Sequence, residues 1–299
     1  MSLTFKIYND LEECKNIWDQ IATIKTVNDC WDYRVCFYDI KCPLYFIAAF
    51  ENNNLVGLLP LQFNEVENYL QFFGGRFISS NRIYTKDNNA EIKRELVLET
   101  EKQTKMNLYL NYMTYEDEYT NSYQFKDNLY VLDISNFQTL NDYIDKTFKK
   151  KSRSVFRRKL KKFESISHTL EFNRFEDIDR MMEFNIQNFG DDSYFNEDII
   201  KQGVKRLLKS GIKIITISVL IDNIPQSITY SAEFENYFYY LNSGTNKNSV
   251  SDLGNYSVLK TLEYAITNKF EFFDAGSNDC NWKERWHFKA IPEGIYKNY

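Results

Sequence analysis

Residues 253–286 have the sequence LGNYSVLKTLEYAITNKFEFFDAGSNDCNWKERW, and this stretch decides the fold. The aromatic run 270–273 lies between Asn268 and Gly276, which predicts a buried strand that delivers Asp274 to a loop. A glycine loop, a helix and a strand therefore follow one another, and a helix N-terminus beside a strand end is a place where anions bind. The helix is indicated by apolar residues at the spacing of one buried stripe, namely Val258, Leu259, Leu262, Ala265 and Ile266.

A β-hairpin pattern occurs twice in the chain. Residues 45–61 consist of two apolar runs around the turn cluster 51–54, and residues 212–233 consist of two β-rich runs around Asp222 and Asn223. A short strand is expected after each hairpin, and helices are expected before each. This repeated order indicates two lobes, although the identity between the halves is slight and two unrelated hairpins are the alternative. The other expected elements are helices at 11–24, 91–104, 176–189 and 198–209, and strands at 69–73, 107–113, 129–134 and 237–241.

The C-terminal stretch resembles the GNAT superfamily of acetyltransferases. More narrowly, it is similar to the two-lobed branch related to the Fem peptidyltransferases and to acetyltransferases linked with polysaccharide synthesis. In that branch a turn, a helix and a strand ending in Asp-x-Gly precede a Tyr/Trp-Lys-x-x-Trp signature. The matching residues here are Asp274-Ala275-Gly276 and Trp282-Lys283-Glu284-Arg285-Trp286.

The resemblance implies an α/β (α+β) protein of two tandem GNAT-like lobes, each a mixed, mostly antiparallel sheet flanked by helices. We expect the lobes at residues 1–134 and 135–299, with the acyl-donor site in the second and the substrate cleft between them. One departure concerns the pyrophosphate loop, which has several glycines in the family. Here Gly254 is the only glycine of residues 251–255, and Asp252 would repel phosphate.

Composition restricts the class of protein further. With 299 residues, 43% of them hydrophobic and 17% aromatic, the chain is globular and long enough for a large core. The net charge of −5 gives no overall attraction to nucleic acid or membrane, so anion binding would need a local patch. We expect no signal peptide, no membrane span and no metal site, since the chain has two histidines and its five cysteines lack metal-ligand spacing. Free thiols predict a cytoplasmic location.

The most charged segment lies between the two halves. One helix is expected over residues 140–163, with Lys149, Arg153, Arg157 and Lys161 forming a basic row at a spacing of four. This row is either a solvated face, a binding surface for phosphate or an acidic polymer, or a contact for nucleic acid such as tRNA. The family has an Arg-rich helix here, and Arg153 and Arg157 match it best as substrate-binding residues. We expect those two to face the cleft, and Arg158, Lys159 and Lys162 to face solvent.

Four residues are candidates for catalysis. A GNAT-like reaction is direct attack of an amine on an activated acyl group, which needs an oxyanion donor, a base and an acid. The resemblance places the oxyanion donor, a backbone N–H, near residues 239–241. Tyr240 could protonate the leaving thiolate, and either Glu233 or Asp274 could accept the amine proton. Lys283 is expected to meet Asp274 and to hold an acyl oxygen or a phosphate, and a purely structural ion pair is the alternative.

The expected donor site is the start of the helix at 253. Its candidate residues are Leu253, Gly254, Asn255, Tyr256 and Lys247, with an ordinary polar loop as the alternative for Lys247. His287 is expected to be a packed, neutral residue of a strand. The cofactor implied is acetyl-CoA or another acyl-CoA as co-substrate.

These observations predict an N-acyltransferase, with acetyl as the favoured group, acting on an amine of a small molecule, glycan or peptide. The alternative within enzymes is a Fem-type transfer from aminoacyl-tRNA, in which the basic row would follow the RNA. The alternative from another class is a binding module that kept the GNAT fold and lost the chemistry, which Asp252 and the lone Gly254 favour.

Overall fold

A computed structural model describes residues 3–114 and 124–299, and the chain divides into two compact units. Unit 1 comprises Met1–Leu129, Gln202–Arg206 and Ile291–Tyr299, and unit 2 comprises Tyr130–Lys201 and Leu207–Ala290. The predicted lobe boundary after Ile134 stays a prediction. In the described part of the chain, no helix combines the length and the apolar character that crossing a membrane requires.

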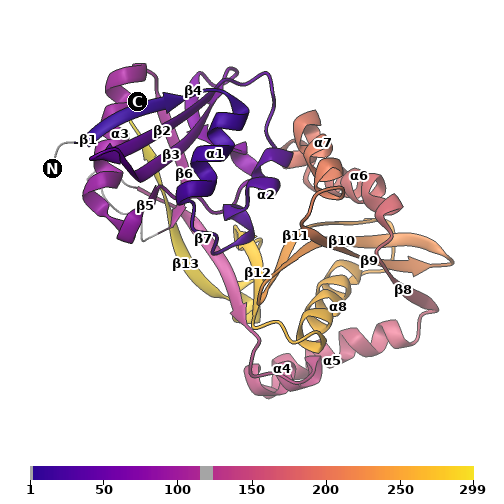
Figure 1. Cartoon of the computed structure of the whole chain (residues 1–299). Coiled ribbons are helices and arrows are strands. Elements are labelled where there is room, and N and C mark those ends of the chain that lie inside the picture. The colour runs from indigo at the N-terminus through magenta and orange to yellow at the C-terminus, as the bar shows by residue number, and fades with distance from the viewer. Residues whose placement is uncertain (1–2, 115–123) are drawn as a thin grey trace. The chain divides into compact units, whose positions relative to one another are not determined.

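Unit 1 is a sheet in the order β1-β2-β3-β4-β6, with β5 paired to β3. The side chains of β2 alternate between two helices, because successive residues of a strand point to opposite faces. Ile47 and Ala49 pack with the residues of α3, whereas Phe46 and Ala48 pack with those of α1. Figure 1 labels both helices and β2. The elements are β1 Leu3–Tyr8, α1 Leu11–Ile21, α2 Trp31–Cys36, β2 Leu44–Glu51, β3 Asn54–Asn64, β4 Tyr69–Phe72, β5 Tyr84–Thr85, α3 Ala90–Thr104 and β6 Leu108–Thr114.

Unit 2 contains the sheet β12-β11-β10-β9-β8, in which only the β11–β12 pair is parallel among the described pairings. Two strands, β7 Gln124–Asp133 and β13 Lys289–Lys297, and one helix, α7 Asp198–Leu207, have residues in both units. The other elements are α4 Leu140–Thr147, α5 Lys150–Glu164, β8 His168–Phe172, α6 Ile178–Phe189, β9 Lys213–Ile221, β10 Ile224–Phe234, β11 Tyr237–Thr245, α8 Leu253–Thr267 and β12 Phe272–Ser277.

Helices α6 and α8 cover opposite faces of the unit 2 sheet (Figure 1). The α8 face includes Thr229 of β10, whose hydroxyl lies 3.0 Å from that of Thr261. On the α6 face, Asn185 donates to the side chain of Asn242 at 2.8 Å. Both faces of the strands are therefore covered, which explains why the sequence of β9, KIITISVLI, is nearly continuous in apolar residues.

The two predicted hairpins are confirmed, and they use the same turn. Glu51 pairs with Asn54, and Ile221 pairs with Ile224, so each loop has two residues. All four loop residues have a positive φ, between 49° and 63°, as a type I′ turn requires. Asn and Asp tolerate this conformation better than most residues do, so the turn chemistry is the reason that both hairpins were predictable.

Several predicted elements differ from the structure. The helix expected over residues 140–163 is two helices, because Phe148 and Lys149 have extended backbone and turn the ring of Phe148 onto Phe156. Asp274 lies inside β12 and not in the loop after it. The expected strand around His287 is wrong, since residues 284–286 form a 3-10 turn and His287 has a φ of 62°. Strand β1 was not predicted.

Gly244 provides a test of the packing of α6 on β11. A Cβ added there would lie 2.1 Å from the carbonyl oxygen of Met181, which is backbone and cannot rotate away. We expect Gly244→Ala to destabilise the protein by about 2 kcal/mol, which lowers the melting temperature by roughly 4–8 °C in a chain of this length. Thermal unfolding followed by circular dichroism measures the shift.

Gly254→Ala is the matched control, because a Cβ at that position meets only the Thr245 hydroxyl at 3.5 Å. Alanine is the better helix former by up to about 1 kcal/mol, so this variant should melt at or above the wild-type temperature. If the two variants had the same melting temperature, the inference that α6 packs closely on β11 at Gly244 would be wrong.

Candidate active site

The candidate site is built where β11 and β12 part. Their parallel register runs from Tyr237 opposite Phe272 to Tyr239 opposite Asp274, and both strands continue beyond it. On its other side, β11 skips one residue against β10, because Tyr230 pairs with Asn242 and Ser231 with Tyr240. Leu241 is therefore the extra residue of a β-bulge, which bends the strand away from its neighbour. Residues 239–241 thus stand at an opening between strands.

Asp274 lies at the end of the paired register and is 7% exposed. Its carboxylate accepts a hydrogen bond from the N–H of Gly276 at 2.7 Å. Burial raises the pKa of Asp274 to about 6, while the Gly276 bond and the charge of Lys283 act in the opposite direction. A carboxyl with a pKa near the operating pH can accept and release a proton efficiently.

Lys283 is 4% exposed and lies near enough to Asp274 for its charge to lower the pKa of that carboxyl. Its ammonium donates to the carbonyl oxygens of Gly276 and Ser277 at 3.0 and 2.7 Å, and lies 5.3 Å from the centre of the Tyr130 ring. Lys283 therefore fixes the loop that follows β12. The rings of Trp282 and Trp286, 5.0 Å apart, hold the same segment from both sides of Lys283.

Tyr240 and Glu233 lie on the α8 face of the sheet, whereas Asp274 is on the opposite face. The ring of Tyr240 stacks on Phe273 at 6.0 Å, and burial raises the pKa of its hydroxyl to about 12. Glu233 forms an ion pair with Lys213 and accepts a hydrogen bond from Tyr264 at 2.8 Å. The structure therefore does not bring Glu233 to Asp274, while Tyr240 stands in the strand segment that opens.

The N-terminus of α8 has free backbone donors. In the part of the chain that the structure describes, the N–H groups of Gly254 and Asn255 have no hydrogen-bond partner. Asp252 precedes them, and Lys159 of α5 pairs with its carboxylate at 2.9 Å. This bond lowers the pKa of Asp252, so the residue stays ionised and its charge is balanced locally. The repulsion of phosphate expected from Asp252 is accordingly offset.

Lys159 and Lys162 do not point only to solvent, as we expected from the sequence, but contact the loop before α8. Lys162 donates to the backbone and side-chain oxygens of Ser251, at 2.8 and 2.5 Å, so both lysines hold the loop before α8. Their spacing of three residues indicates that they lie on one face of α5. The sequence does not indicate their partner, because the loop that they contact lies about ninety residues away. Lys247, by contrast, donates to the carbonyl oxygens of Gln187 and Asn188 near the end of α6.

Two other residues expected at the donor site, Leu253 and Tyr256, contact the interior of the protein. Leu253 is buried among Phe163 and Val219, and Tyr256 stacks on Phe163 at 4.3 Å. The hydroxyl of Tyr256 lies 2.7 Å from the ring nitrogen Nε2 of His168. These contacts hold the first turn of α8 against α5 and β8, and so position the free N–H groups.

Arg153 and Arg157 both approach Asp145 of α4. Arg157 forms a short ion pair with its carboxylate, and Arg153 lies 3.8 Å from the same oxygen. Other basic residues of this segment, Lys149, Lys150, Lys151, Arg158 and Lys161, form no ion pair within residues 3–114 and 124–299. The row is thus partly neutralised at Asp145 and uncompensated elsewhere.

The segment that contains this site is similar to a known protein family. Residues 150–284 match the model of the acetyltransferase (GNAT) domain family. No curated protein sequence is significantly similar to the chain.

Solved structures match over nearly the whole chain. FemX has a TM-score of 0.61 at 12% identity, with 99% of this chain and 97% of that one covered. A tandem GNAT protein from the clavulanic acid biosynthesis pathway has a TM-score of 0.63 at 10% identity, covering 99% and 98%. L-PGS from Bacillus licheniformis has a TM-score of 0.62 at 11% identity, covering 96% and 91%.

The family match identifies residues 150–284, which contain the opening between β11 and β12, as a GNAT acetyltransferase domain. The whole-chain similarities show that the chain shares its fold with FemX and with a tandem GNAT protein, which is the two-lobed fold that the sequence predicted. At identities of 10–12% they establish the fold alone.

The raised pKa of Asp274 predicts a pH dependence of stability. Between the ordinary value of 3.8 and about 6, the folded state retains a proton that the unfolded state has lost. The contribution of this carboxyl to stability is therefore largest below 3.8 and is lost as the pH rises through about 6. We expect Asp274→Asn, relative to wild type, to gain on the order of 2 kcal/mol between pH 4.5 and 7. Urea unfolding at both pH values measures this, and a pH-independent difference would contradict it.

Proposed function

We propose that the protein is an N-acyltransferase that moves an acyl group, with acetyl favoured, from acyl-CoA to an amine of a small molecule, glycan or peptide. The observation that carries this proposal is the opening at residues 239–241, where a bulged strand leaves its parallel neighbour directly beside the buried Asp274. A backbone N–H exposed at such an opening can stabilise the oxyanion of an acyl-transfer intermediate.

The chain's own groups fit the phosphates of acyl-CoA. The free N–H groups of Gly254 and Asn255 lie at a helix N-terminus, where the helix dipole favours an anion. Lys159 and Lys162 hold the loop just before them and would supply positive charge. Lys247, which we expected here, is engaged by carbonyl oxygens of α6. The bound donor would supply the activated thioester.

The remaining roles follow from charge and position. Asp274 would accept the proton of the attacking amine, since its pKa of about 6 is close to neutral pH. Tyr240 keeps its proton at neutral pH and would give it to the leaving thiolate. The ammonium of Lys283 would stabilise the reacting acyl group. Glu233, which is paired with Lys213 and Tyr264, is the weaker candidate for the base.

Donor binding is testable by thermal shift. A ligand at about 100 times its dissociation constant stabilises the native state by about 2.7 kcal/mol. Acetyl-CoA should therefore raise the melting temperature by roughly 5–10 °C in a chain of this length. Lys159→Gln should reduce the shift, because it removes a cation beside the α8 N-terminus, whereas Lys151→Gln on the same helix should leave it unchanged. Absence of any shift with CoA esters would overturn the proposed donor.

A second function is favoured by one observation, the uncompensated cations of α5. Together with the Fem-like fold, they are compatible with aminoacyl-tRNA as the donor, since RNA binding depends on unpaired Lys and Arg. Binding measurements with CoA esters and with tRNA distinguish the two possible donors. Association with tRNA that weakens steeply with salt, without any response to CoA esters, would establish the second function in place of the first.

Lys283→Met tests the role of the lysine at the site. This variant retains the aliphatic stem and removes the charge, so we expect turnover to fall by about 10²-fold if the ammonium stabilises the reacting acyl group. Two carbonyl oxygens also lose a donor, so a decrease in stability of about 1–3 kcal/mol should accompany the loss. Steady-state rates well below the melting temperature measure the first effect.

Asp279→Ala is the matched control for the loop. Asp279 accepts a hydrogen bond from the N–H of Glu284 at 2.9 Å, so the variant loosens the same segment without removing Lys283. Its turnover should stay near that of wild type. If Lys283→Met worked at the wild-type rate, or if both variants lost turnover equally, the lysine would be structural only.

A further inference from the structure

A pocket separate from the β11–β12 opening lies among α4, α5 and α8, which pack against one another in unit 2. Its volume is about 490 Å³, enough for a small organic molecule. The α8 residues that line it, Tyr256, Lys260 and Glu263, follow the i, i+4, i+7 spacing of one helix face. The neighbouring Thr261 points to the sheet, toward Thr229. The pocket therefore opens on the side of α8 away from the strands.

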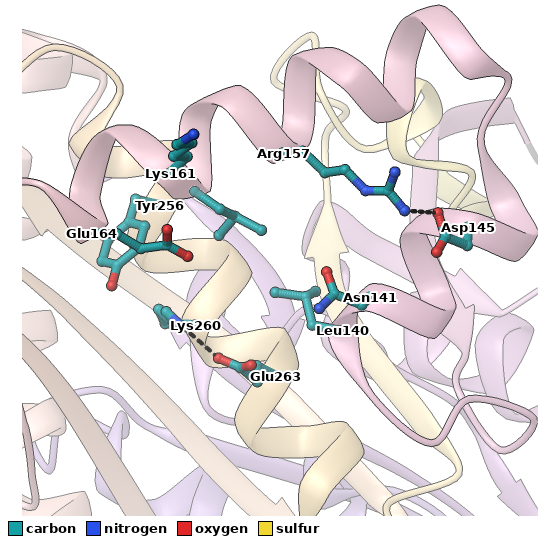
Figure 2. Close-up of a pocket in the computed structure, with 10 residues that line it drawn as sticks. Leu140, Asn141, Asp145, Arg157, Lys161, Glu164, Tyr256, Lys260 and Glu263 are labelled. Atoms are coloured by element: carbon teal, nitrogen blue, oxygen red, sulfur yellow. Dashed lines mark hydrogen bonds and ion pairs between the residues drawn. The ribbon is translucent and has the colours of Figure 1, made fainter.

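The charges of this pocket balance. It is lined by three basic side chains and three acidic ones, and four of the six form two ion pairs (Figure 2). Arg157 pairs with Asp145, and Lys260 pairs with Glu263 at 2.7 Å. The remaining two, Lys161 and Glu164, form no ion pair in the part of the chain that the structure describes. One unpaired cation and one unpaired anion are thus left at the pocket.

Lys161 and Glu164 lie three residues apart on α5, so they are neighbours on one helix face. Beside them the pocket has an apolar surface, formed by Leu140, Leu160 and the ring of Tyr256. Tyr256 is fixed in place, because it stacks on Phe163 and its hydroxyl is bonded to His168. The pocket is thus lined by one unpaired cation and one unpaired anion of α5 and by apolar side chains.

We propose that this pocket binds a zwitterionic ligand with an apolar side chain, of the class of free amino acids and short peptides, at a site distinct from that of acyl transfer. The carboxylate of the ligand would pair with Lys161 and its ammonium with Glu164, while its side chain would contact Leu140, Leu160 and Tyr256. A polyanion such as a nucleotide is disfavoured, because it would need several available cations and Arg157 and Lys260 are already paired with carboxylates. The inference does not depend on the identity of the acyl donor.

The experiment is calorimetric titration of the full chain with L-phenylalanine and two analogues that each lack one charge. Phenethylamine has no carboxylate and 3-phenylpropanoate has no ammonium, so each should bind at least about threefold to tenfold more weakly than L-phenylalanine. Lys161→Gln should weaken L-phenylalanine by a similar factor and leave phenethylamine unaffected. Glu164→Gln should weaken L-phenylalanine and leave 3-phenylpropanoate unaffected. Lys151→Gln, on the same helix outside the pocket, should change none of these affinities.

Exchanging the charges of Lys161 and Glu164 tests the same proposal independently. Lys161→Glu and Glu164→Lys should each abolish binding, and the double variant should recover it, because a zwitterion can reverse its orientation between two exchanged charges. Circular dichroism confirms that each variant is folded. The proposal is overturned if neither L-phenylalanine nor L-leucine binds at millimolar concentration, if either single-charge analogue binds as tightly as L-phenylalanine, or if the double variant fails to recover binding.

Discussion

The parallel pairing of β11 with β12 is the constraint on which the geometry of the candidate site depends. Parallel strands need a crossover, and α8 supplies it, so the N-terminus of α8 comes to the same edge as the carboxyl ends of both strands. Ligands of open α/β sheets collect at this edge. The pairing extends over only three residue pairs, after which the bulge at Leu241 bends β11 aside. The short parallel pairing of β11 with β12 thus positions three features at the same edge of the sheet. They are Asp274, the free N–H groups of α8 and the strand opening.

Helix α5 stabilises this arrangement electrostatically. Its lysines 159 and 162 hold the loop before α8, and its phenylalanines pack on Tyr256 and Trp286. The carboxylate of Asp252 would oppose an anion at the same helix end. Pairing with Lys159 offsets that opposition at the proposed donor site. A cation supplied from a distant helix therefore compensates for a departure in the local sequence.

The sequence predicted correctly those elements that depend on neighbouring residues. It did not predict features that depend on contacts between residues far apart in the chain. The two hairpins were predicted correctly because Asn52, Asn53, Asp222 and Asn223 favour the turn conformation by themselves. The break at Phe148 was missed because its cause is a ring that packs on Phe156. The nearness of Asp274 and Lys283 was predicted from the spacing of the C-terminal motif. The contacts of Lys159, Lys247 and Glu233 were not, since each depends on a partner elsewhere in the fold.

Charge distribution separates the two binding regions of unit 2. At the N-terminus of α8, amide N–H groups and lysines outnumber the one carboxylate nearby, and that carboxylate is already paired. About two turns further along the same helix, Lys260 is paired with Glu263, and acids of α4 and α5 also line the pocket there. An anion is favoured at the first place, whereas at the second the charges of the lining side chains balance. The two proposed sites on this helix would therefore select ligands of different charge, a phosphate at its end and a zwitterion along its side.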